Sequence, residues 1–152
     1  MSEVWTGGCQ CGAVRYALSE RPKSEFCHCS MCRRATGGVF AALGTVPKSA
    51  VRWTRGEPAY FASSTAVERG FCARCGTPLT FAYHDSGGMD VTLGSLDDPE
   101  AVGPLQLEFA VESRLSWMPV VGGTQQRLDE DAASPAHRPD FRSLQAPRDG
   151  GA

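Results

Sequence analysis

The chain has 152 residues, of which 41% are hydrophobic and 21% charged, a composition that suits one folded domain and excludes wholesale disorder. Its net charge of -2 lacks the basic excess of a general nucleic-acid-binding protein, so we expect a small molecule or a protein as partner and no nucleic acid. The first residues carry no basic start followed by an apolar run, and no segment is apolar for long enough to cross a bilayer. We therefore expect no membrane association and a cytoplasmic location.

Between residues 4 and 111, short runs rich in Val, Phe, Tyr, Trp and Thr alternate with Gly and Pro. The expected strands are residues 13–18, 39–46, 51–54, 66–71, 79–83, 90–93 and 105–111. Helical periodicity is confined to a turn after Cys29 and to residues 98–102, where Pro99 suits a first helical turn. The sequence predicts a mainly β fold, a small single domain of short antiparallel strands. Because such short strands have weak individual cores, a further link between the strand ends is expected.

The composition changes after residue 121. A Gly-Gly pair at 122–123 is followed by an acidic run at 129–131 and by prolines at 135, 139 and 147. We interpret residues 1–121 as one folded domain and residues 122–152 as a flexible C-terminal tail. Exposed sheet edges would allow a homodimer. Six aromatic residues are expected to pack in the core or on the sheets: Trp53, Tyr60, Phe61, Phe71, Phe81 and Trp117. The alternative is that one of them forms the wall of a small pocket.

All seven cysteines fall in three clusters, with the sequences CQC at 9–11, CHCSMC at 27–32 and CARC at 72–75. A disulfide framework would leave one thiol unpaired, and a chain without a secretory signal is expected in a reducing compartment. Buried thiols without metal are the plainest alternative, because free cysteine behaves as a small hydrophobic residue. Three clusters at ligand spacing favour metal binding instead.

The spacing within each cluster indicates how the ligands divide. Residues i and i+2 of an extended chain share a face, so the two cysteines of the first cluster can bind one ion. By the same rule Cys27 and Cys29 can bind another, while His28 points away. The two-residue spacer between Cys72 and Cys75 is typical of a zinc knuckle, a tight turn in which both sulfurs reach one ion.

Pairing the first and third clusters yields a closed site of four thiolates, Cys9, Cys11, Cys72 and Cys75. The three remaining ligands, Cys27, Cys29 and Cys32, leave a fourth position for water or substrate, as in catalytic zinc sites. The alternative is that His28 or His84 supplies a fourth ligand and makes the second site purely structural. We expect two zinc ions per chain in either case.

The clusters lie within longer motifs, GCQCGAVRY at 8–16, CHCSMCRRATG at 27–37, RGFCARCGT at 69–77 and ESRLSW at 112–117. Together they closely resemble the family of glutathione-dependent formaldehyde-activating enzymes and the related centromere protein V domain, over about residues 6–117. The resemblance implies a β-tent fold, a structural zinc on the four-cysteine set and a catalytic zinc on Cys27, Cys29 and Cys32. It also implies carbon–sulfur lyase activity, the interconversion of formaldehyde plus glutathione with S-hydroxymethylglutathione. Where the family often shows a histidine before the last motif, this chain has Leu107-Glu108-Phe109-Ala110.

Two arginines follow the last cysteine of the second cluster. Arg33 and Arg34 could bind the carboxylates of a glutathione-like thiol through charge-assisted hydrogen bonds, although neighbouring residues cannot both face one ligand. The sequence thus predicts a zinc-dependent carbon–sulfur lyase whose thiol substrate binds at the open position of the second zinc. The alternatives are a binding module with two structural zincs, and a thiol or aldehyde carrier without turnover.

Overall fold

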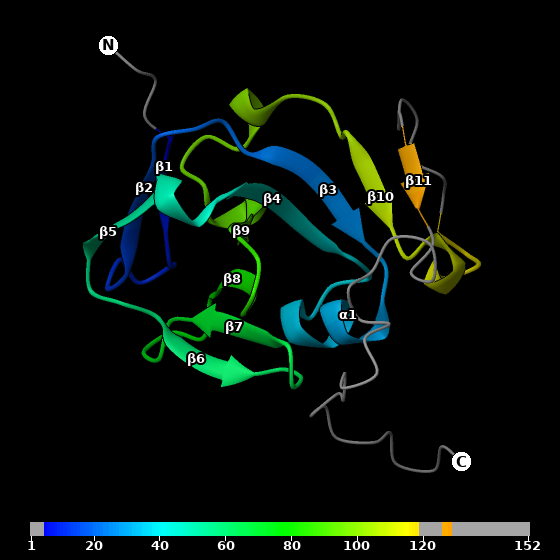
Figure 1. The fold of residues 1–152 in the computed structure, drawn as a ribbon, viewed down its shortest axis with the longest axis horizontal. Helices are drawn as coiled ribbons and strands as arrows, with labels where there is room; N and C mark the ends of the chain where they lie inside the picture. The colour runs from blue at the N-terminus through cyan, green and yellow to red at the C-terminus, as the bar shows by residue number, and fades with distance from the viewer. Residues whose placement is uncertain (1–4, 119–125, 129–152) are drawn as a thin grey trace.

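The structure is a computed structural model that describes residues 5–118 and 126–128. Within these residues the fold consists of a three-stranded sheet, an eight-stranded sheet and one α-helix (Figure 1). The smaller sheet contains, in order, β1 (Trp5–Gly8), β2 (Arg15–Leu18) and β5 (Val51–Arg55). The larger sheet has the order β11 (Gln126–Leu128), β10 (Leu107–Phe109), β3 (Lys23–Cys27), β4 (Ala41–Pro47), β9 (Gly88–Thr92), β8 (Pro78–Tyr83), β7 (Val67–Phe71) and β6 (Ala59–Ala62).

Most strand pairs are antiparallel, and β10 pairs in parallel with both β3 and β11. The mainly β prediction is confirmed, and the expected strands correspond to β2, β4, β5, β7, β8, β9 and a shorter β10. Strands β1, β3, β6 and β11 were not predicted. The sequence of β3, KSEFC, is mostly polar and carries little β signal, so its conformation depends on pairing with β4 on one side and β10 on the other.

The α-helix α1 (Ser30–Thr36) confirms the turn expected after Cys29. Cys29 caps its start, since the Cys29 sulfur accepts a hydrogen bond from the backbone N–H of Cys32 at 3.3 Å. Gly37 ends it with a φ of 72°, a left-handed conformation that costs glycine little. Four short 3-10 turns are also described: η1 (Lys48–Ala50), η2 (Leu93–Ser95), η3 (Glu100–Val102) and η4 (Val111–Ser113).

The buried side chains form two hydrophobic clusters, and each contains cysteines. The first spans both sheets and includes Tyr16, Leu18, Leu79, Val91, Cys9 and Cys72. The second, smaller cluster comprises Cys27, Cys29, Cys32, Ala41, Leu43 and Ala110. The three-cysteine group therefore lies within the core, and the four-cysteine group contributes Cys9 and Cys72 to it.

Three of the aromatic residues expected to pack are instead exposed. Trp117 is 69% exposed, Phe61 52% and Tyr60 48%. Tyr60 and Phe61 lie on β6, the edge strand of the larger sheet, where no further element covers them within the described residues.

Only part of the predicted tail can be compared with the structure. Gln126–Leu128 form a strand beside β10, and the rest of residues 122–152 lies outside the described residues. None of the helices that the structure describes is long and apolar enough to span a membrane.

Candidate functional site

Four cysteine sulfurs from two distant turns meet at the first candidate metal site. The ligand atoms of Cys9, Cys11, Cys72 and Cys75 all lie within 4.8 Å of one another. The Cys9 and Cys11 sulfurs are 3.6 Å apart, and those of Cys11 and Cys72 are 3.8 Å apart. Cys9 and Cys72 are buried, whereas Cys11 and Cys75 are exposed.

In both turns, the glycine after the second cysteine donates its backbone N–H to the carbonyl of the first cysteine. After β1, the N–H of Gly12 donates to the Cys9 carbonyl at 3.0 Å; after β7, the N–H of Gly76 donates to the Cys72 carbonyl at 2.8 Å. Gly12 and Gly76 have φ values of 75° and 77°, which a side chain would oppose. Hydrogen bonding to Thr77 lowers the pKa of the Cys75 thiol to about 5, so this sulfur favours the thiolate form that a metal requires.

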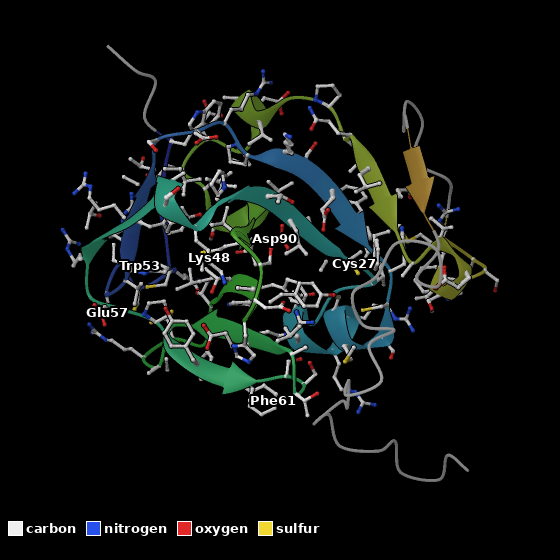
Figure 2. All side chains as sticks on the ribbon, in the orientation of Figure 1. Cys27, Lys48, Trp53, Glu57, Phe61 and Asp90 are labelled. Carbon is white, nitrogen blue, oxygen red and sulfur yellow. The ribbon has the colours of Figure 1, made fainter. Side chains whose placement is uncertain are left out.

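The second candidate site contains three sulfurs, all deeply buried. Cys27 ends β3, Cys29 caps α1 and Cys32 lies in the first turn of that helix, and their sulfurs also lie within 4.8 Å of one another. Figure 2 places Cys27 beside α1, far from Trp53 on the smaller sheet. The neighbouring thiols of Cys29 and Cys32, together with burial, raise the pKa of the Cys27 thiol. Three thiolates at such short distances repel one another, and a bound metal cation would offset this repulsion.

The residues fit zinc in both places. Tetrahedral zinc with bonds of about 2.3 Å to sulfur places its ligands about 3.8 Å apart, close to the sulfur–sulfur distances of the first group. The donor sets consist of soft thiols, which favour zinc over magnesium or calcium. Four ligands would form a closed site, and three would leave one position open.

The two histidines considered as a fourth ligand lie elsewhere. His28 is fully buried, and its Nε2 points at the Glu108 carboxylate at 3.1 Å. Burial lowers the pKa of His28, so the imidazole is neutral and donates this hydrogen bond. Glu108 is fully buried too and forms an ion pair with Arg114 at 2.8 Å. His84 is exposed in the turn after β8.

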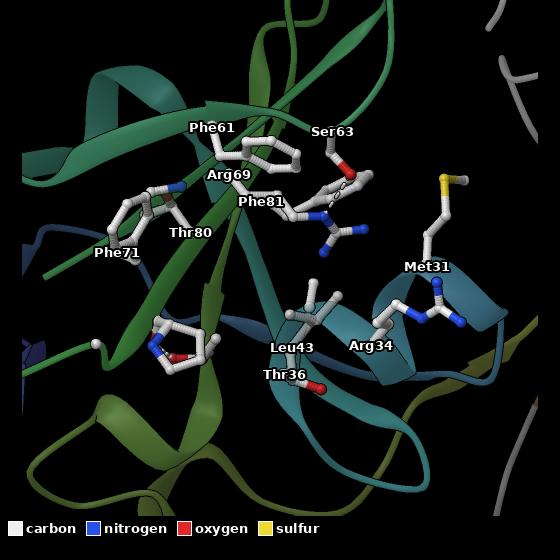
Figure 3. Close-up of a pocket in the computed structure, with 15 residues that line it drawn as sticks. Met31, Arg34, Thr36, Leu43, Phe61, Ser63, Arg69, Phe71, Thr80 and Phe81 are labelled. Atoms are coloured by element: carbon white, nitrogen blue, oxygen red, sulfur yellow. Dashed lines mark hydrogen bonds between the residues drawn. The ribbon is translucent and has the colours of Figure 1, made fainter. Parts of the chain in front are cut away.

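The two arginines predicted to bind substrate take different positions. Arg33 donates hydrogen bonds from its guanidinium to the backbone carbonyls of His28 and, at 2.6 Å, of Ser113, so it ties α1 to η4. Arg34 lines a pocket of about 430 Å³ between α1 and the strands β7 and β8 (Figure 3). The two neighbouring arginines of α1 thus lie in different surroundings, Arg33 against backbone carbonyls and Arg34 on the pocket wall.

The sequence interpretation assigned no role to Arg69, which lies at the inner end of this pocket. It is only 8% exposed, and its guanidinium donates to Ser63 Oγ at 2.9 Å and to the Cys32 sulfur at 3.4 Å. The guanidinium also lies over the Phe81 ring, 4.7 Å from the ring centre. The sequence held a hint of this position. Arg69 and Phe71 are two residues apart on one strand and share a face, and both side chains line the pocket.

The sequence interpretation also assigned no role to two carboxyl groups near the second site, those of Asp90 and Glu25. Burial raises the pKa of Asp90 to about 6, and burial with the nearby charge of Asp90 raises the pKa of Glu25 to about 8. Asp90 accepts a hydrogen bond from Thr45 Oγ1 at 2.6 Å. Strand pairing puts Arg69, Phe81, Asp90 and Thr45 in one row across the larger sheet.

Comparison with known proteins identifies the family. The model of the glutathione-dependent formaldehyde-activating enzymes matches residues 4–112. The chain belongs to this family. That stretch contains both cysteine groups, Arg69 and the pocket, so the formaldehyde-activating domain includes the whole candidate site.

Two curated proteins and one solved structure are similar to this chain. An uncharacterised lyase of Schizosaccharomyces pombe is 40% identical over 80 residues, which are 52% of this chain and 58% of that protein. A Halomonas elongata protein, whose provisional name is glutathione-dependent formaldehyde-activating enzyme, is 26% identical over 131 residues, covering 80% of this chain and 83% of its own. A Rhodobacter sphaeroides crystal structure superposes with a TM-score of 0.51 at 25% identity, over 66% of this chain and 96% of that one.

Proposed function

We propose that this protein is a zinc-dependent carbon–sulfur lyase that acts on the hydroxymethyl adduct of glutathione or a similar thiol. The observation that carries the proposal is the group of three buried sulfurs beside a pocket, with no histidine or carboxylate completing the group within the described residues. A closed structural site would need a fourth protein ligand. The family membership and the lyase name of one relative support the same reaction class.

When bound, a zinc ion on Cys27, Cys29 and Cys32 would offer its open position to the substrate sulfur and hold that sulfur as a thiolate. In the lytic direction, the carbon–sulfur bond of the adduct breaks and its electron pair stays on sulfur. The hydroxyl loses its proton to water as the carbon–oxygen bond becomes the carbonyl of formaldehyde, and the released thiol takes up a proton. The reverse direction forms the adduct.

The protein itself contributes positioning and charge. Arg34 lines the pocket, where its positive charge favours an anionic substrate. Arg33 donates hydrogen bonds to two backbone carbonyls and supports the fold around α1. Holding thiol and aldehyde together in one pocket lowers the entropic part of the barrier.

The first experiment measures zinc by elemental analysis and glutathione binding by calorimetry on the same sample. We expect two zinc ions per chain and glutathione binding in the wild type, in line with the two cysteine groups. The variant Cys32→Ser should lose one zinc and its thiol binding. Formaldehyde release from S-hydroxymethylglutathione, followed by proton NMR, then tests turnover.

Other outcomes point to the alternatives. Two zinc ions without any thiol binding would contradict the lyase and favour a module with two structural zincs. Thiol binding without formaldehyde release would identify a carrier.

A further inference from the structure

The residues that line the pocket beside the three-cysteine group limit the chemical class of ligand that it can bind. Its volume of about 430 Å³ is within the range of small-molecule sites. Apolar and aromatic side chains form much of its wall, including Met31, Leu43, Phe61, Phe71 and Phe81. Among the described residues that line it none is acidic, and two are arginines that come from opposite sides, β7 and α1 (Figure 3).

Arg69 is the more deeply placed of these two cations. Its contacts to Ser63 and Cys32 use two of the five N–H groups of a guanidinium. Asp90 is close enough to interact electrostatically, but Arg69 forms no ion pair with it or with any other carboxylate in the part of the chain that the structure describes. The group of potential negative charge that Arg69 does contact is the Cys32 sulfur, through one N–H group. A buried guanidinium in apolar surroundings is stabilised by an anion that reaches its remaining N–H groups.

We propose that Arg69 binds the carboxylate of the substrate, and that the substrate is a thiol carboxylic acid with an apolar body rather than the polar tripeptide glutathione. This inference rests on the proposed function, since it names the substrate class of the same site. The contact between Arg69 and the Cys32 sulfur puts the acid-binding group directly beside the three-cysteine group. The acid and the thiol of the substrate are therefore close together, as in a mercapto acid.

The pocket distinguishes such an acid from glutathione. Glutathione has an ammonium group and two peptide bonds, and none of the described lining residues offers its ammonium a carboxylate. An aromatic or aliphatic body would instead lie against Phe61 and Phe71, and the rigid position of Arg69 between Ser63 and Phe81 would orient the acid.

The test compares three thiols on the zinc-containing protein by calorimetry: 2-mercapto-3-phenylpropanoic acid, its methyl ester and glutathione. We expect the acid to bind about 10- to 100-fold more tightly than the ester, the range that a charge-assisted hydrogen bond supplies, and more tightly than glutathione. Arg69→Met should abolish the preference for acid over ester, whereas a mainly structural role would weaken both ligands equally. Arg52→Met, an exposed arginine on β5, is the matched control and should keep the preference.

A second variant tests the apolar wall without disturbing a buried residue. Phe61 is 52% exposed, so Phe61→Ala should fold, and it should weaken the phenyl acid several-fold while leaving 3-mercaptopropanoic acid unchanged. Binding of the phenyl acid to Phe61→Ala can be measured even if Arg69→Met does not fold.

The possible failures are distinguishable. If the wild type binds no thiol at all, the proposed function is wrong. If glutathione binds but acid and ester bind equally, or if the preference survives Arg69→Met, the inference is overturned while the lyase proposal stands.

Discussion

At the scale of single residues, buried charges organise the surroundings of the second cysteine group. His28 lies between two of its cysteines, and its ring is held by Glu108, which is held in turn by Arg114. The family often carries a histidine just before the ESRLSW motif. In this chain the same stretch supplies a fully buried carboxylate to the histidine of the second cluster. This network fixes the backbone between Cys27 and Cys29.

Removing the shared carboxylate should be costly. Glu108→Ala leaves the Arg114 charge and the His28 ring without their partner, and we expect a loss of about 3 to 5 kcal/mol in the free energy of unfolding. Urea denaturation of the zinc-containing protein measures this. Glu20→Ala, at an exposed position, should change stability by less than about 0.5 kcal/mol. A loss as small as the control's would show that the network does not support the fold.

Tyr16 predicts a dependence of stability on alkaline pH. Burial raises the pKa of its hydroxyl to about 12, although the hydroxyl also bonds Ser95 at 2.7 Å. A raised folded-state pKa stabilises the protein below the unfolded value of about 10, and this contribution disappears as the pH rises toward 12. The wild type should therefore lose on the order of 2 kcal/mol more than Tyr16→Phe over this range. Urea unfolding at stepped pH compares the two, and parallel pH profiles would contradict the assignment.

At the scale of elements, α1 combines several functions in seven residues. It presents Cys32 to the second candidate metal site and Arg34 to the pocket, while Arg33 fastens it to η4. Such a short helix has little stability of its own, so its caps matter. The Cys29 sulfur supplies one cap, and Gly37 supplies the other by donating its N–H to the Arg33 carbonyl at 2.9 Å.

The C-terminal cap can be tested with a matched pair of glycines. A Cβ at Gly37 or at Gly87 would meet nothing within 4 Å, but only Gly37 has a positive φ. Gly37→Ala should lower the free energy of unfolding by about 1 to 2 kcal/mol through backbone strain alone. Gly87→Ala should be neutral or slightly stabilising. Thermal unfolding of both variants provides the comparison, and equal effects would rule out strain at Gly37.

At the scale of the whole molecule, the two cysteine groups differ in what they connect. The four-cysteine group joins the turn after β1 to the turn after β7, and Cys11 and Cys72 are 61 positions apart in the sequence. It therefore fastens the smaller sheet to the larger one. The three-cysteine group joins residues within a single stretch from the end of β3 to α1. Closing a long loop restricts the unfolded chain more than closing a short one.

Loss of the four-cysteine group should therefore destabilise the protein more than loss of the three-cysteine group. Cys72→Ser and Cys32→Ser should each lose one zinc, and Cys72→Ser should lose on the order of 5 kcal/mol or more, since structural zinc sites contribute roughly 10 to 16 kcal/mol. Cys32→Ser should retain a cooperative thermal transition. Elemental analysis and scanning calorimetry on both variants measure these effects, and a smaller shift for Cys72→Ser than for Cys32→Ser would contradict the difference in roles.

The sequence alone was sufficient for the mainly β class, the turn after Cys29 and the family. These depend on local information: alternation of apolar residues, the spacing of thiols and short motifs around them. Strand β3 was missed because its polar sequence becomes a strand only through its neighbours on both sides. The exposure of Tyr60 and Phe61 was missed for a related reason, since composition does not reveal which strand is the edge.

Only the tertiary structure decided what surrounds the three-cysteine group. Arg69 is 37 residues from Cys32 in the chain, and Glu108 is 80 residues from His28. The period of two along a strand predicts which side chains share a face, but the register between strands determines which of them meet across the sheet. Packing between distant segments brings Arg69 against the Cys32 thiol, whereas Arg33 donates its hydrogen bonds to backbone carbonyls. Local spacing in the sequence does not determine which partner each charged side chain meets.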